Sequence, residues 1–371
     1  MVSWVYSLFT YILLTEYALL LVIGVGGNLW VVSLLLRIFC SSTRGRRSFL
    51  SEHLYVYLSA LSVADLLVLS VIPFVLTQWF SGSWKFGLVA CKYFWTVENV
   101  NKLLSVALLT AMSFDRYCAV CHPFRLRALH RKSTVGLIIS GAVVIVVVAL
   151  MPVMVYTTVQ RVSFAGPNNT TTVVLICSFD RLVSDSFLHV FISYLFTLGY
   201  LLPATVIVYC YSRLLLFVRS HAFGRRRQQS PLTQSTALQP NLQSRRQRRQ
   251  SVALGRSDQL MTSLSNSVKK VVIFYFVCWT PYWIFVLLPL LKTNPAAHSG
   301  PFVVLHMFVH TLPYVNSAAN WIFYALLNRQ LIDGARRSQT AATVPESGVE
   351  QPNGTASSVR LALNQLRNSK Q

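Results

Sequence analysis

The sequence predicts an all-α membrane protein, a seven-transmembrane helix bundle with its N-terminus outside. Only 12% of the 371 residues are charged and the mean hydropathy is +0.51, whereas a soluble domain carries about 25% charged residues. Seven apolar runs are each long enough, at roughly 20 residues or more, to cross a hydrocarbon core of about 30 Å as a helix. The runs cover residues 11–36, 54–80, 93–114, 134–156, 187–218, 270–291 and 302–327.

The placement of Lys and Arg predicts the orientation of the bundle. Of the 33 Lys and Arg residues, 27 fall on one side when the runs alternate across the membrane. Cytoplasmic loops carry such an excess, so the N-terminus is expected to be extracellular and the chain to lie in the plasma membrane. We therefore expect a short extracellular N-terminus at residues 1–10, a seven-transmembrane domain at 11–330 and a cytoplasmic tail at 331–371. The loop at 219–268 is basic and lacks apolar periodicity, which predicts disorder; its basic runs are expected to meet anionic lipid rather than nucleic acid.

Two cysteines and two sequons belong to the predicted outer side. Cys91 and Cys177 are the only cysteines there, where oxidation is permitted, so we expect one disulfide between them. It would tie the top of the third helix to the loop at about 157–186. The same loop contains "NNTT", with overlapping sequons at Asn168 and Asn169, which makes glycosylation an expectation for an extracellular loop.

Polar residues lie deep inside four of the runs, beginning with Asn28 in the first. Ionisable groups at membrane depth nearly always face the bundle interior and mark a ligand or ion pathway. Asp65 lies in the middle of the second run, and Asn101 and Ser105, spaced i, i+4, share one face of the third helix. Together with Asn316 and Asn320 of the seventh run, these oxygens suit a hard cation such as sodium. Two interpretations stay open: a sodium pocket, or a hydrogen-bonded plug that fixes helix packing. No other cofactor is expected.

The third run carries charges where a membrane span is usually apolar. Glu98 and Lys102 are spaced i, i+4 with the acid first, the favourable orientation for an ion pair. A charge at the bilayer centre costs at least ~2.5 kcal/mol, so mutual neutralisation is one interpretation. However, Glu98 lies seven residues below Cys91, about 10 Å along a helix, the depth of a cavity open to the outside. The second interpretation is therefore that Glu98 awaits a cationic ligand. Arg116, beside Asp115, lies about 27 Å further along the same helix, at the cytoplasmic boundary.

Short motifs along the runs carry a resemblance to a known family. They are "GN" at 27–28, "LSVAD" at 61–65, "WKFG" at 84–87, the cysteine pair, "DRY" at 115–117, Pro203 with Tyr211 eight residues on, and "CWTP" at 278–281. Together these motifs resemble the rhodopsin-like (class A) G-protein-coupled receptors over the whole chain except the loop 219–268 and the tail. Within that family, "VENVN" at 97–101, Gln78 and "LPYVNSAAN" at 312–320 are similar to the somatostatin, opioid and allatostatin C peptide-receptor group.

The resemblance implies roles for individual residues. Glu98 would meet a basic group of a neuropeptide, and Asn101 would help to bind allosteric sodium. Agonist binding would shift Trp279, and Arg116, released from Asp115, would face a G protein of the Gi/o class. Arrestin and a receptor kinase are further expected partners. The implied ligand pocket comprises Glu98, Gln78, Lys102, Trp279, Tyr282 and Tyr314. The implied G-protein-coupling set comprises Asp115, Arg116, Tyr117, Tyr211 and Tyr324.

Some residues depart from the family pattern, and other functions compete. Trp321 stands where the seventh-helix motif usually has proline, so the kink that proline gives cannot be assumed. Lys102 has no counterpart expected in that group, so a ligand carboxylate is a second candidate partner. A small-amine receptor would usually offer more helix-5 serines than Ser193, and a retinal sensor needs a Lys that 302–327 lacks. A transporter would show broken helices or repeats, which are not visible, and no catalytic set supports an enzyme.

Overall fold

The computed structural model describes residues 2–40, 49–122, 132–165, 171–180, 184–228, 266, 268–288 and 300–342. The chain divides into two compact units, Met1–Asn328 and Arg329–Gln371. In the second unit, the described residues are the last turns of a helix that begins in the first.

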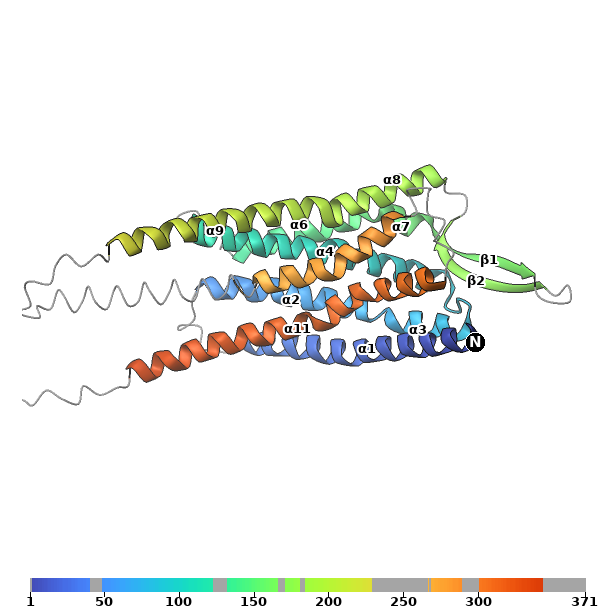
Figure 1. Cartoon of the computed structure of the whole chain (residues 1–371), viewed down its shortest axis with the longest axis horizontal. Helices are drawn as coiled ribbons and strands as arrows, with labels where there is room; N and C mark the ends of the chain where they lie inside the picture. Colours follow the sequence, from blue (N-terminus) through green and yellow to red (C-terminus); the bar gives the residue numbers. More distant parts are fainter. Residues whose placement is uncertain are drawn as a thin grey trace, which may run out of the picture. The chain divides into compact units, whose positions relative to one another are not determined.

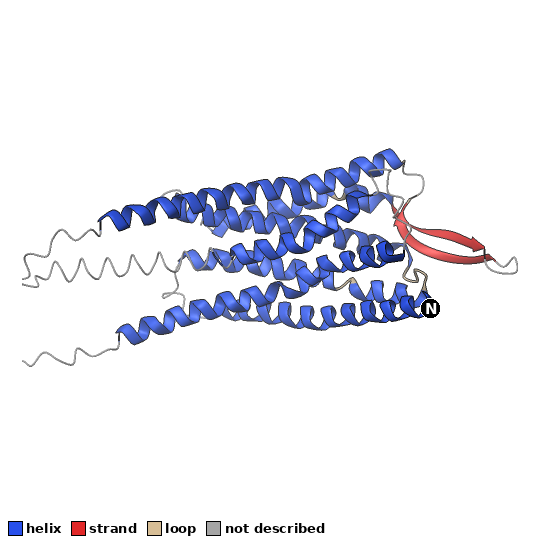
Figure 2. Cartoon of the chain, viewed as in Figure 1, coloured by secondary structure: helices blue, strands red, loops and turns tan. Residues whose placement is uncertain are grey.

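The described part of the first unit is a bundle of seven helical segments, which confirms the predicted fold class (Figures 1 and 2). In chain order they are α1 (Val2–Cys40); α2 (Phe49–Leu69) with α3 (Ile72–Ser81); α4 (Gly87–Cys121); α6 (Lys132–Ala149) with α7 (Met151–Tyr156); α8 (Asp185–Phe196) with the π-helix η3 (Thr197–Leu201) and α9 (Leu202–Gln228); the helix Val268–Leu287; and α11 (Gly300–Ala342).

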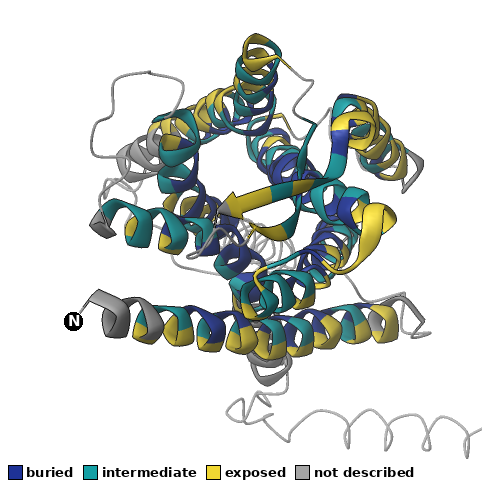
Figure 3. Cartoon of the chain, turned by 90° about the vertical axis from the view of Figure 1, so that its right-hand side faces the viewer, coloured by how far each residue is buried: buried dark blue, intermediate teal, exposed yellow. Residues whose placement is uncertain are grey.

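Five of these segments have the length and apolar composition to cross a membrane by themselves, and Thr134–Ala149 is a shorter apolar helix. Large apolar side chains cover the outside of the bundle; Val22 is 73% exposed and Leu137 is also 73% exposed. Figure 3 shows buried residues on the inward faces of the helices and exposed residues on the outward faces. Such a surface requires lipid rather than water around it. The chain is therefore a multi-pass membrane protein.

Proline positions explain where three of the spans are interrupted. α3 and α7 each begin with proline at the first helical positions, Pro73 and Pro152. Proline has no N–H to donate to the preceding turn, so the helix before it ends and a new one begins. The π-helix η3 ends two residues before Pro203.

A β-hairpin, which the sequence did not predict, replaces most of the expected loop at 157–186. β1 (Thr157–Ala165) pairs antiparallel with β2 (Thr171–Phe179), with Thr157 opposite Phe179. The β-branched residues of both segments favour strands. Figure 3 shows the hairpin crossing the end of the bundle. The sequons Asn168 and Asn169 lie between the strands, outside the described residues.

The predicted disulfide is confirmed, and it anchors this hairpin. Cys177 of β2 is bonded to Cys91 of α4, with the two Cα atoms 5.6 Å apart. Trp84, almost fully buried, donates its backbone N–H to the Leu175 carbonyl at 2.8 Å. Trp95 of α4 donates its indole N–H to the Cys177 carbonyl at 3.3 Å. The hairpin is thus bound to the outer end of α4 by covalent and polar contacts.

Two expected boundaries differ from the structure. Helix α1 begins at Val2, so residues 2–10, which were expected in a separate segment, are the first turns of that helix. Helix α9 continues to Gln228, into the expected loop at 219–268, because the Arg and Gln residues there are good helix formers. Most of that loop, and the tail from residue 343, lie outside the described residues.

Candidate functional site

Helix α4 carries an internal ion pair in the half that contains the disulfide-bonded Cys91. Lys102 Nζ lies 3.6 Å from Glu98 Oε1, and the two side chains are 7% and 18% exposed. Lys102 Nζ also lies 3.4 Å from Asn99 Oδ1 and 5.1 Å from the centroid of the Tyr282 ring. The structure therefore brings Glu98 and Lys102 together as the i, i+4 spacing indicates. Lys102 also joins α4 to the helix Val268–Leu287 through a cation–π contact.

Aromatic residues surround this pair. Tyr282 packs edge-on against Trp279 at a centroid distance of 5.4 Å, and both are buried. On the other side, Tyr17 of α1 and Tyr314 of α11 pack edge-on at 5.4 Å, and Glu98 acts electrostatically on both. Of the predicted ligand-pocket residues, the structure thus gathers five: Glu98, Lys102, Trp279, Tyr282 and Tyr314. The sixth, Gln78, is half-buried on α3, one turn before Gly82, whose N–H bonds to the Gln78 carbonyl.

Three polar residues near this cluster escaped the sequence analysis. His306 and His310, one turn apart on α11, have ring centroids 4.3 Å apart, and the His310 ring lies 5.1 Å from Tyr282. His310 Nε2 is buried without a hydrogen-bond partner. Glu16 of α1 accepts a 2.8 Å hydrogen bond from the Thr311 hydroxyl. Each of the three is an ionisable residue inside an apolar run, and this was the signal that could have found them.

A second polar cluster lies deeper, around Asp65. Asn320 donates to Asp65 Oδ2 at 3.0 Å. The Ser105 hydroxyl donates to Asn101 Oδ1 at 2.9 Å, and Asn101 in turn donates to the Ser317 hydroxyl at 3.3 Å. The backbone carbonyl of Ser317 also accepts a 3.1 Å hydrogen bond from Asn28. Ser317 of α11 therefore contacts both α1 and α4. The sequence did not indicate this role, because serine is neutral and common in membrane helices.

This cluster retains unsatisfied oxygens. Among the described residues, Asp65 Oδ1, Asn28 Oδ1 and Asn320 Oδ1 are buried without hydrogen-bond partners. Asn316, 2% exposed, is predicted to join them, and its Nδ2 also lacks a partner. A buried acceptor without a partner costs free energy. A donor set of carboxylate and amide oxygens fits a small hard cation.

At the opposite end of α4, Arg116 is fully buried and donates through Nη2 to Asp115 Oδ2 at 2.8 Å. The Tyr117 hydroxyl lies 3.1 Å from His122 Nε2. The Tyr211 hydroxyl of α9 is buried without a hydrogen-bond partner. Tyr324 belongs to α11, but its side chain lies outside the described part of the chain. Arg116 is thus shielded from solvent while it is bonded to Asp115.

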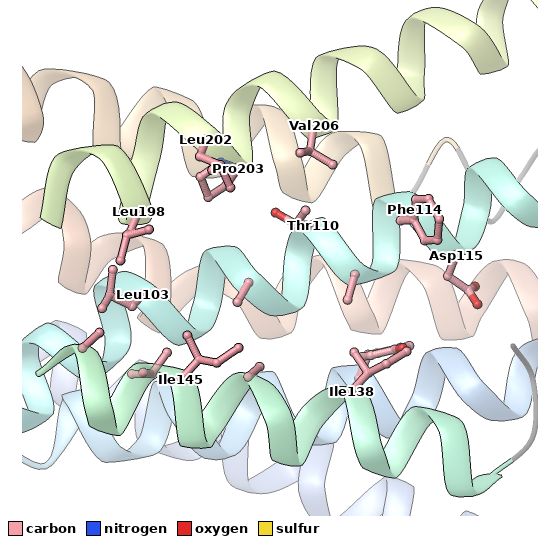
Figure 4. Close-up of a pocket in the computed structure, with 16 residues that line it drawn as sticks. Leu103, Thr110, Phe114, Asp115, Ile138, Ile145, Leu198, Leu202, Pro203 and Val206 are labelled. Atoms are coloured by element: carbon pink, nitrogen blue, oxygen red, sulfur yellow. The ribbon is translucent and has the colours of Figure 1, made fainter. Parts of the chain in front are cut away.

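An apolar cavity of about 500 Å³ lies between α4, α6 and the η3–α9 segment (Figure 4). Its polar lining residues are Thr110, Asp115 and Tyr57. The Thr110 hydroxyl already donates to the Val106 carbonyl at 2.7 Å. This lining suits apolar chains and offers no counterpart of the Glu98–Lys102 pair.

Comparison with known proteins decides the class of this arrangement. Residues 27–324 match the family described as 7 transmembrane receptor (rhodopsin family). The chain belongs to this family. Rhodopsin-family receptors are signalling proteins rather than enzymes, and the match decides against the transporter alternative. It also confirms the resemblance to class A receptors drawn from the motifs.

Individual relatives narrow the resemblance. The chain is 29% identical to Neuropeptide receptor 18 of Caenorhabditis elegans over 340 residues, covering 87% of this chain and 66% of the relative. It is 32% identical to Somatostatin receptor type 4 of Rattus norvegicus over 322 residues, covering 87% and 70%. It is 30% identical to Somatostatin receptor type 3 of Homo sapiens over 328 residues, covering 86% and 66%. The chain thus spans about two thirds of the length of these relatives.

Proposed function

We propose that this receptor is activated by an extracellular neuropeptide whose basic group binds Glu98, and that it signals through a heterotrimeric G protein of the Gi/o class. The observation that carries the proposal is a partly exposed carboxylate, Glu98, below the disulfide-anchored hairpin and within an aromatic wall. The names of the similar proteins, a neuropeptide receptor and somatostatin receptors, support the ligand class. In this proposal the chain lies in the plasma membrane with its N-terminus outside, as its basic residues predict.

In this proposal, the ligand activates the receptor by competing with Lys102 for Glu98. In the resting form, Lys102 neutralises Glu98 and holds the Tyr282 ring. A ligand cation that reaches Glu98 competes with Lys102, because it forms a charge-assisted hydrogen bond with the same carboxylate. The cation–π contact between α4 and the helix Val268–Leu287 is then weakened. The helix Val268–Leu287 can then move relative to α4.

A chain of ring contacts leads from this pair into the bundle. Tyr282 packs on Trp279, and Trp279 stacks on Tyr275 at a centroid distance of 5.5 Å. The Tyr275 hydroxyl donates to the Gly199 carbonyl, within the π-helix η3, at 3.1 Å. Motion of Tyr282 therefore acts on η3 through direct contacts. The ligand shifts a two-state equilibrium because it binds the open state more tightly than the resting state.

We infer that the Asp65 cluster binds sodium in the resting form. The support is the set of unsatisfied oxygens on Asp65, Asn28 and Asn320. A bound cation there would hold α1, α2 and α11 together, so sodium would favour the resting state. At the cytoplasmic end, release of Arg116 from Asp115 would expose a guanidinium for the G protein. Tyr117, Tyr211 and Tyr324 are the proposed neighbours of that contact.

A ligand screen tests the proposed function. Cells expressing the full chain are exposed to basic neuropeptides, and dissociation of each class of Gα subunit is measured together with cAMP. The expected result is that at least one basic peptide dissociates Gi/o heterotrimers and lowers cAMP. Cells expressing Arg116→Ala at equal surface level serve as the signalling control. A response to small amines without a response to any peptide, or coupling only to another Gα class, would refute the proposal.

A further inference from the structure

The proposed binding of a cation to Glu98 leaves a charge to be compensated. Lys102 is 6% exposed, and among the described residues Glu98 is the carboxylate that acts on it. Besides Glu98, the groups that Lys102 contacts in the structure are the side-chain oxygen of Asn99 at 3.4 Å and the Tyr282 ring, and neither carries a full negative charge. A buried ammonium group without a counter-ion is strongly unfavourable. The occupied pocket therefore needs one more anion.

A second unsatisfied group lies on the same side of the pocket. His310 Nε2 is buried without a hydrogen-bond partner, and its ring lies 5.1 Å from the Tyr282 ring that Lys102 also contacts. His306 lies behind it at 4.3 Å between centroids. His310 comes from α11 and Lys102 from α4, so potential donors from two helices contact Tyr282. An imidazole N–H and an ammonium group together match a carboxylate.

The remaining nearby acid does not supply the missing charge. Glu16 lies on α1, where its Oε1 is held by the Thr311 hydroxyl at 2.8 Å. Glu16 and Glu98 both act electrostatically on Tyr17 of α1. Lys102 and His310 thus both contact the Tyr282 ring, whereas Glu16 is bonded to Thr311.

We propose that Lys102 and His310, backed by His306, form an anion subsite beside Glu98, and that the ligand enters with a basic C-terminal residue bearing a free carboxylate. This inference rests on the proposed function, because it takes Glu98 as the partner of the basic group. Glu98 lies about 10 Å below the disulfide along α4, and the hairpin crosses that end of the bundle. A chain end reaches such a depth more readily than the middle of a chain. A C-terminal Arg or Lys delivers both required charges on one residue.

Two small probes that differ in one group test the subsite. N-acetyl-L-arginine carries a guanidinium and a carboxylate, whereas N-acetyl-L-argininamide carries the guanidinium alone. Binding of each to the purified full chain in lipid nanodiscs is measured by saturation-transfer NMR titration. We expect the acid to bind at least about tenfold more tightly than the amide, since a charge-assisted hydrogen bond is lost in the amide.

Variants assign that preference to the proposed residues. Lys102→Met and His310→Phe, each of similar size to the original, are expected to abolish or strongly reduce the preference for the acid, while Lys102→Arg retains it. Lys92→Met is the matched control, because Lys92 lies on the same helix but bonds to the carbonyls of Met154 and Val155. Thermal melting of each variant verifies that it is folded. The comparison of the two probes on the wild-type receptor tests the subsite even if a variant does not fold.

The outcomes separate this inference from the function on which it rests. Equal binding of the two probes, tighter binding of the amide, binding of neither, or a preference that survives Lys102→Met overturns the anion subsite. Glu98→Gln is expected to weaken both probes equally. If the preference for the acid persists while Glu98→Gln changes neither affinity, the subsite stands and the cation site at Glu98 fails. If an amidated basic peptide activates the receptor through Glu98, the cation site at Glu98 stands and the anion subsite fails.

Discussion

Gly27 gives the sharpest prediction about packing. A Cβ atom at this position would lie 2.1 Å from Cδ1, 2.2 Å from Nε1 and 2.3 Å from Cγ of Trp321. These atoms belong to the rigid five-membered ring near the root of the side chain, so a small rotation cannot clear them. Small residues allow such close approach of membrane helices. A Cβ atom added to the neighbouring Gly26 would have no other atom within 4 Å.

We therefore expect Gly27→Ala to destabilise the receptor by about 1–3 kcal/mol, the usual cost of an overpacked interior. Thermal unfolding of the purified receptor in detergent is the assay, with a fall of several degrees expected in the midpoint. Gly26→Ala should leave the midpoint unchanged or raise it slightly, because alanine favours a helix over glycine.

A double variant connects the loss to one contact. Gly27→Ala combined with Trp321→Ala should melt no lower than Trp321→Ala alone, since the clash has been removed and the two changes are strongly non-additive. If Gly27→Ala and Gly26→Ala melt alike, or if the double variant shows the sum of both losses, the close approach of α1 and α11 is refuted.

Three further predictions concern sodium, the disulfide and basal signalling. Asp65→Asn should abolish the thermal stabilisation that NaCl provides over choline chloride at equal ionic strength; a sodium effect that persists would contradict the cation site. Cys91→Ser should cost about 2–5 kcal/mol, because the disulfide closes a loop of 86 residues. The melting midpoint of the wild type should fall under reductant toward that of the variant, and no difference would count against an anchoring role. Lys102→Met should raise basal G-protein activation about 2- to 30-fold, the range for losing a cation–π contact of about 0.5–2 kcal/mol with Tyr282. Basal activity that is unchanged at equal surface expression would show that Lys102 does not restrain the helix.

The sequence alone was sufficient for the bundle and for the pairs whose geometry is local. Apolar length predicts spans because a helix must satisfy its own backbone in lipid. Spacing along one helix predicts the Glu98–Lys102 contact, since residues four apart share a face. The Cys91–Cys177 bond followed from the predicted sidedness of the membrane, which left only two cysteines in the oxidising compartment.

Features made by contacts between distant segments could not be predicted in this way. Ser317 is a neutral residue whose role depends on α1 and α4 approaching it together. The hairpin depends on pairing two short segments, and short strands have a weaker signature than membrane helices. The close approach of Gly27 to Trp321 joins α1 to α11, nearly the full length of the bundle apart in sequence. No spacing rule along one helix contains that information.

For the same reason, part of the polar cluster around Glu98 and Lys102 was missed by the sequence analysis. His310 and Glu16 lie in apolar runs and belong to helices at opposite ends of the chain. Only the fold shows that His310 reaches Tyr282 and that Glu16 is held by Thr311. The sequence predicted one acid and one base in this region, whereas the structure adds ionisable residues of α1 and α11 to the same cluster.

The most direct test of the central claim measures peptide-stimulated guanine-nucleotide exchange by purified, reconstituted receptor, with wild type compared with Glu98→Gln. A basic peptide found by the screen should lose at least about tenfold in potency on Glu98→Gln, because a charge-assisted hydrogen bond is replaced by a neutral one. Glu98→Asp, which keeps the charge, should retain most of the potency. Equal potency at wild type and Glu98→Gln would contradict the claim that Glu98 binds the ligand's basic group.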